Sequence, residues 1–119
     1  MHNVRWFADL SMNDVAAVGG KNASLGEMYR QLADRGIRVP NGFATTSDAF
    51  REFLDANDLR PMITETLDGW DGEDVDDLTS RARRIRTAIT AGHLTDDLVE
   101  GVVDAYRQLS VEAGVPAVD

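Results

Sequence analysis

Residues 19–21, two adjacent glycines followed by a lysine, constrain this fold more than any other stretch of the chain. Apolar side chains recur after them at the spacing of one helical face: Leu25, Met28, Tyr29, Leu32 and Ala33. Gly36 is a typical helix stop, so a helix is predicted from about Asn22 to Arg35. The apolar segment Val4–Ala8 predicts a strand before the glycines. The predicted order is therefore strand, short connector, glycine loop and helix.

A glycine pair at the start of a helix is a place where phosphate can be held. Glycines let the backbone approach a ligand, and a helix N-terminus adds unpaired N–H donors and the positive end of the dipole. Lys21 is the only lysine beside eleven arginines, and it would add a mobile charge. We therefore predict a phosphate site at Gly19, Gly20, Lys21 and Asn22. The alternative is a simple turn followed by a solvated lysine, because the spacing of a Walker A loop is absent.

Residues 37–46 form the second informative stretch. Pro40-Asn41-Gly42 predicts a turn, and residues 43–45 predict a short strand. Thr46 or Ser47 is then predicted to cap a helix that reaches about residue 56. Thr45 and Thr46 could offer hydroxyl groups to a nucleotide. The alternative is that one is a strand residue and the other an N-cap.

The rest of the chain reads as helices separated by short breaks. A short helix is predicted at residues 59–67, a longer one from residue 75 to Gly92, and a last one between Thr95 and Gly114. The acidic loop at residues 68–74 lacks the register of a calcium-binding EF-hand loop, so we assign it no metal. These patterns predict a mostly helical α+β fold with short strands.

Composition excludes several classes of function. The net charge is −9, and residues 47–119 carry seven basic against seventeen acidic groups, which argues against nucleic-acid binding. Residues 1–46 are close to neutral, so an anion would be least repelled there. There is no cysteine, and no Ser/His/Asp set for nucleophilic catalysis. No apolar run is long enough to span a membrane, so a cytoplasmic protein is expected.

Three segments together resemble the start of the phosphoenolpyruvate synthase (pyruvate, water dikinase) family: Trp6–Leu10, Val18–Met28 and Val39–Thr46. The resemblance is strong over residues 4–57 and extends in helix pattern to the end. It implies the N-terminal portion of an ATP-grasp-type nucleotide-binding domain, like that of pyruvate phosphate dikinase. In this family a loop lysine contacts ATP phosphates, and Lys21 is the matching position.

The resemblance also implies a reaction and partners. In the family, ATP bound with Mg²⁺ phosphorylates a histidine on a separate domain. That histidine passes the phosphoryl group to pyruvate on a third domain, which yields phosphoenolpyruvate, AMP and phosphate from pyruvate, ATP and water. The expected partners of this segment are therefore ATP, the rest of the nucleotide-binding domain, the phosphohistidine domain and the pyruvate-binding domain.

The chain departs from the family in length. Residues 1–119 are expected to be an incomplete N-terminal segment of the nucleotide-binding domain, because family members are several times longer. We assign no catalytic residue and no metal ligand, since the family places these further on. Neither His2 nor His93 is expected to be the phosphohistidine. The alternatives are a segment of a related phosphotransferase, of the pyruvate, phosphate dikinase or rifampin phosphotransferase type, or a non-catalytic stand-alone binding module.

Overall fold

The computed structural model describes residues 3–116, so His2 lies outside the described residues. These residues fall into two compact units. The first unit contains the chain up to Phe50 together with the chain from Asp96 onward, and the second unit is Arg51–Thr95. We describe each unit by itself.

Helices dominate both units, and the strands are short, which confirms the mostly helical α+β prediction. In chain order the elements are β1 (Val4–Trp6), the 3-10 turns η1 (Phe7–Asp9) and η2 (Met12–Asp14), α1 (Val15–Val18), α2 (Gly20–Ala33), β2 (Phe43–Thr45), α3 (Ser47–Ala56), α4 (Leu59–Leu67), α5 (Val75–Ala91) and α6 (Asp96–Ala113).

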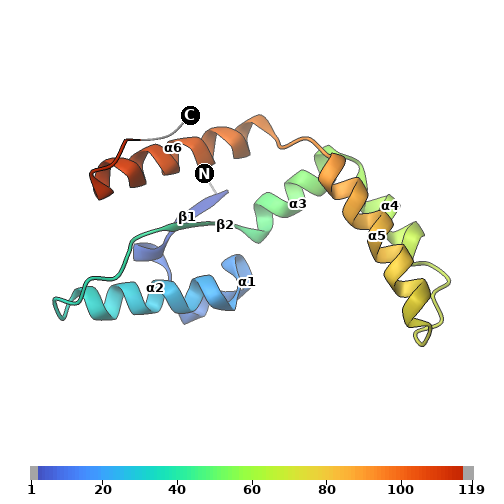
Figure 1. Cartoon of the computed structure of the whole chain (residues 1–119), viewed down its shortest axis with the longest axis horizontal. Helices are drawn as coiled ribbons and strands as arrows, with labels where there is room; N and C mark the ends of the chain where they lie inside the picture. The colour runs from blue at the N-terminus through green and yellow to red at the C-terminus, as the bar shows by residue number, and fades with distance from the viewer. Residues whose placement is uncertain (1–2, 117–119) are drawn as a thin grey trace. The chain divides into compact units, whose positions relative to one another are not determined.

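Strands β1 and β2 form an antiparallel pair in the first unit, and Figure 1 shows this pair between α2 and α6. Arg5 lies opposite Ala44, and the rings of Trp6 and Phe43 pack with centroids 5.5 Å apart. The first strand was predicted to reach residue 8, but it ends at Trp6. The reason is the next residue: the Phe7 carbonyl accepts a hydrogen bond from the Leu10 N–H and closes a 3-10 turn.

The predicted turn at residues 40–42 is wrong, because this segment is an irregular connection without a turn. It runs past η1, where the Gly42 carbonyl accepts a hydrogen bond of 2.9 Å from the Phe7 N–H. A Cβ atom on Gly42 would lie 2.6 Å from the Phe7 ring. Gly42 therefore allows the connection before β2 to pack closely against Phe7, and it does not form a chain-reversing turn.

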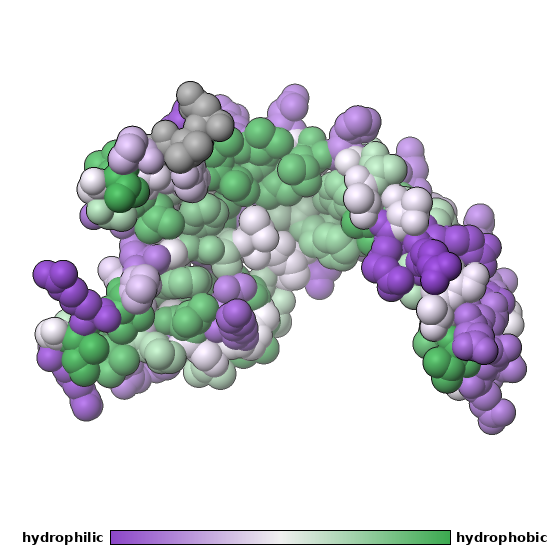
Figure 2. Space-filling model, in the orientation of Figure 1, coloured by the Kyte–Doolittle hydropathy of each residue, from purple (hydrophilic) through white to green (hydrophobic). Residues whose placement is uncertain are grey.

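The core of the first unit is small and centres on Leu10, which is fully buried. It packs with Val18, Ala23 and Ala44. Helix α2 buries Ala23 and Gly26, while Met28 is 48% exposed, so the predicted apolar face of this helix is not the face that packs on the core. Large apolar side chains also remain exposed on α6, among them Val99, Val103 and Val111. Figure 2 shows green surface over this helix.

The second unit packs α4 against α5 around buried Phe53 and Leu59. The side chain of Asn57 ties the ends of this unit together. Its Nδ2 donates to the His93 carbonyl and its Oδ1 accepts from the His93 N–H, both at 2.9 Å. The predicted helix limits are confirmed here, since Asp58 is left-handed before α4 and Asp74 caps α5.

Candidate functional site

Gly19 joins two helices at the predicted glycine loop. It ends α1, where its N–H donates to the Val15 carbonyl at 2.8 Å, and it begins α2, where its carbonyl accepts from the Ala23 N–H at 3.0 Å. Its φ of +84° lies in the region that favours glycine. Gly19 is therefore required for the corner itself, whether or not a ligand binds there.

The N-terminus of α2 is open. No side chain caps it through Gly19, and apart from the adjoining residues and the backbone of the helix itself no atom lies within 4 Å of the position that a Cβ would occupy on Gly19 or Gly20. Helix α2 begins at Gly20, two residues earlier than predicted, so Lys21 belongs to its first turn. The first N–H groups of a helix have no partner within the helix. This corner therefore offers backbone donors to an anion.

The other two predicted phosphate-binding residues differ in their surroundings. Lys21 is exposed, and within residues 3–116 its side chain forms no ion pair or hydrogen bond. Asn22 is half-buried, and its Nδ2 donates to the Val18 carbonyl at 2.9 Å. The side chain of Asn22 therefore closes the end of α1, while Lys21 is free to reach a ligand.

The start of α3, which follows the two threonines, contacts α1. Ser47, the first residue of α3, donates its hydroxyl to the carbonyls of Ala16 and Ala17 in α1, at 2.9 and 3.2 Å. Thr46 is 5% exposed, and its Oγ1 accepts from the Ala49 N–H, so it is the N-cap of α3. Thr45 is exposed at the end of β2. Thr45 is thus a strand residue and Thr46 an N-cap, as the alternative to a nucleotide contact predicted, and Thr46 borders a cavity together with Ala17 of α1.

Sequence reasoning missed Arg5, which borders a small polar cavity of about 330 Å³ with Thr46 and Asp48. Its Nη1 lies 3.0 Å from Asp14 Oδ1, and its Nη2 donates to the Asp9 carbonyl. The alternation of side chains along residues 4–6 could have shown that Arg5 points to one face of the sheet. It could not have shown that Asp14 lies on that face and pairs with Arg5. Arg5 is thus an anchor for the connector before the glycine loop.

Asp14 is held by a capping box, in which it accepts a hydrogen bond from the Ser11 N–H while the Ser11 side chain caps the first turn of η2. The hydrogen bond from the backbone N–H of Ser11 lowers the pKa of Asp14 below its usual 3.8, burial opposes this, and the hydrogen bond and charge of Arg5 lower the pKa further. The carboxylate form is therefore favoured in the folded chain.

We expect acid to remove this contribution. Because the folded pKa of Asp14 lies below the unfolded one, its stabilisation is complete above 3.8 and is lost as the pH falls through the folded pKa. Urea unfolding of the parent and of Asp14→Asn should therefore differ most at neutral pH, and the two free energies of unfolding should converge in acid. A difference that stays constant across this range would contradict the assignment.

Two further kinds of feature are absent from the part of the chain that the structure describes. Among residues 3–116, no group of three or more His, Asp or Glu side chains could hold a metal ion. None of the described helices has both the length and the apolar character needed to cross a membrane.

Comparison with known proteins identifies a matching family and similar proteins. The family model described as "Pyruvate phosphate dikinase, AMP/ATP-binding domain" matches residues 15–118. The chain is 47% identical over 109 residues to the phosphoenolpyruvate synthase of Escherichia coli, and 40% identical over 116 residues to that of Aquifex aeolicus. These matches cover 92% and 98% of the chain but only 14% of each relative. The chain therefore spans about one seventh of the length of these relatives.

Proposed function

We propose, from the premise that the chain belongs to the family described as the pyruvate phosphate dikinase AMP/ATP-binding domain, that its α1–α2 corner holds ATP phosphates. The observation that carries this proposal is the open first turn of α2, where Lys21 stands exposed beside uncapped backbone N–H groups. The turn alternative explains the φ of Gly19. It does not explain why the only lysine of the chain comes directly after the two glycines.

The chemistry of this corner is electrostatic. Phosphoryl transfer depends mainly on positioning and on neutralising the charge of the phosphate oxygens. The backbone N–H groups of Gly20 and Lys21 would fix the position of a phosphate. The mobile ammonium group of Lys21 would neutralise part of the negative charge of that phosphate. Thr45 and Thr46 remain candidates for the nucleotide side of the site. The hydroxyl oxygen of Thr46 is already an acceptor in the α3 cap, so Thr45 is the freer of the two.

We further propose that this segment serves a phosphoenolpyruvate synthase, supported by the names of the relatives. In that role ATP would phosphorylate a histidine on another domain, and pyruvate would be the final acceptor. A cytoplasmic location fits these soluble substrates. Mg²⁺ would accompany ATP, but the described residues do not offer a set of ligands for it. We therefore assign no magnesium ligand to this segment and no catalytic step to this chain alone.

Titration of the isolated, ¹⁵N-labelled chain with ATP tests the proposed position. We expect the amide signals of residues 20–22 to shift, because their N–H groups would donate to a phosphate oxygen. Tripolyphosphate should shift the same signals, since the proposed contacts are made to phosphate and not to the base. Shifts confined to other residues, or none at millimolar nucleotide, would contradict the proposed site.

We expect the isolated chain to hydrolyse no ATP and to phosphorylate no pyruvate. The reason is that the chain covers only 14% of the two relatives, and the family resemblance places the magnesium ligands and the acceptor histidine outside this part. Phosphate release and pyruvate consumption are the measurements, with the Escherichia coli relative as the positive control. Metal-dependent turnover by the pure chain that disappears in Lys21→Ala would contradict this expectation.

A further inference from the structure

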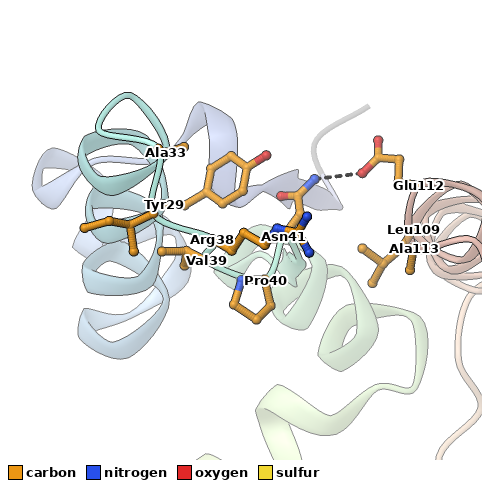
Figure 3. A pocket seen from close by; sticks show the side chains of 11 residues that line it. Tyr29, Ala33, Arg38, Val39, Pro40, Asn41, Leu109, Glu112 and Ala113 are labelled. Atoms are coloured by element: carbon orange, nitrogen blue, oxygen red, sulfur yellow. Dashed lines mark hydrogen bonds between the residues drawn. The ribbon is translucent and has the colours of Figure 1, made fainter.

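The first unit contains an apolar groove of about 830 Å³ between the end of α2, the connection after it and the end of α6. We call it the α2–α6 groove. Figure 3 shows Tyr29, Val39 and Pro40 on one side of it and Leu109 and Ala113 on the other. Its apolar lining is typical of a site that receives apolar side chains.

The groove explains why the apolar face predicted for α2 does not pack on the core. The predicted apolar face included Tyr29 and Ala33, and both of these line the groove and do not pack into the core. Ile37, just after α2, also lines the groove and is 51% exposed. The apolar pattern of this end of α2 is therefore real, but no described residue covers it. Apolar surface of this kind marks an interaction site.

A polar atom in the groove also lacks a partner. The Nδ2 of Asn41 donates to Glu112 Oε2 at 2.9 Å, across the groove, while Asn41 Oδ1 is buried without a hydrogen-bond donor among the described residues. If the amide of Asn41 were flipped, its oxygen would face the carboxylate of Glu112, and neither atom could donate a hydrogen bond. The orientation with Nδ2 toward Glu112 is therefore the favourable one. A buried acceptor without a donor costs free energy. The occupant of the groove should therefore bring an N–H group as well as apolar side chains.

The groove is distinct from the proposed phosphate site. Lys21 lies in the first turn of α2 and Ala33 is its last residue, so the two are about 18 Å apart along the helix. The groove is also lined chiefly by apolar side chains; its one cation among the described residues is Arg38, and the N–H of its glycine, Gly36, already donates to the Ala33 carbonyl. A polypeptide segment fits this combination of apolar lining and one buried acceptor.

We propose that the α2–α6 groove receives a segment of the polypeptide that phosphoenolpyruvate synthases carry outside the part matched here. The match covers only 14% of the Escherichia coli and Aquifex aeolicus relatives, so most of each protein lies outside it. The segment would place apolar side chains between Tyr29 and Leu109 and donate an N–H to Asn41 Oδ1. The proposal rests on the part of the proposed function that places this chain in a longer phosphotransferase, and not on Lys21.

Photo-crosslinking in a full-length chimera tests the occupant directly. The chimera is the Escherichia coli phosphoenolpyruvate synthase with its matched segment replaced by this chain, and benzoylphenylalanine replaces Ile37. We expect crosslinks from position 37 to peptides outside the replaced segment. The matched control is benzoylphenylalanine at Val111, which is 80% exposed on α6 and does not line the groove. It should give no such crosslink.

Two outcomes would overturn the proposal. Crosslinks only between two chimera molecules would show that a second copy fills the groove. Absence of crosslinks at position 37 in a folded chimera would show that the groove stays open. A chimera that fails to fold under conditions in which the parent relative folds would also count against the proposal, since the groove would not accept that polypeptide.

A stability comparison gives an independent readout. In the isolated chain, Ile37→Asp and Val111→Asp should both leave the thermal midpoint nearly unchanged, because both side chains are largely exposed. In the chimera, Ile37→Asp should lower the midpoint clearly and Val111→Asp should not, because a charge would be buried only at position 37. Equal effects of the two substitutions in the chimera would contradict the proposal. Loss of ATP binding in Lys21→Ala would leave this result untouched, so the two proposals can fail separately.

Discussion

Lys21→Ala should weaken ATP binding by about ten- to a hundredfold in the full-length chimera. The exposed ammonium group has no partner within residues 3–116, so its removal breaks no internal contact. What is lost is a charge-assisted hydrogen bond to phosphate, which contributes roughly 1.5–3 kcal/mol. Isothermal titration with ATP measures the affinity, and the thermal midpoint should hardly change. Lys21→Arg should restore part of the affinity, because a planar fork does not replace a compact ammonium group.

Arg35→Ala is the matched control for the change in net charge. Arg35 is exposed just beyond the other end of α2, so this variant loses one positive charge far from the glycine loop. If long-range attraction accounted for ATP affinity, both variants would lose it to a similar degree. Unchanged affinity in Lys21→Ala with an intact fold would show that residues 19–21 form only a turn.

The limits of most helices could be predicted because local residues determine them. Asp74 caps α5 through the Asp77 N–H, Thr46 caps α3, and Gly114 ends α6 with a φ of +70°. Each signal involves residues within a few positions of one another, so the sequence contains the whole interaction. The glycine loop belongs to the same class, because the conformation of Gly19 depends on the two helices beside it.

The packing of α2 could not be predicted, because it depends on segments that are distant along the chain. The periodicity of the large apolar residues identified the face with Met28 and Tyr29. The core instead lies against the small residues Ala23 and Gly26, since η1 comes close to the backbone there. The same limit applied to the prediction for Asn22, whose side chain donates to the Val18 carbonyl at the end of α1. Residue types alone could not distinguish that contact from a contact with a ligand.

The close approach at Gly26 gives the largest expected effect on stability. A Cβ atom there would lie 2.5 Å from Leu10 Cβ and 3.0 Å from the Phe7 carbonyl oxygen. These are not the flexible ends of side chains, and Leu10 is fully buried at the centre of the core. Gly26→Ala should therefore destabilise the first unit by about 2 kcal/mol, since overpacking of up to about 3 kcal/mol exceeds the helix propensity gained, about 1 kcal/mol.

Gly101→Ala provides the opposite expectation in the same unit. Gly101 lies inside α6, and the nearest atom to its added Cβ, Val4 Cγ2, is 3.7 Å away, which is ordinary contact. Alanine should therefore stabilise α6 by about 0.5–1 kcal/mol. Urea unfolding followed by tryptophan fluorescence, with Trp6 in the first unit as the probe and Trp70 replaced by phenylalanine, measures both variants. If Gly26→Ala were as stable as Gly101→Ala, η1 and α2 would not be in contact through Gly26, and the corner that presents Lys21 would lack its support.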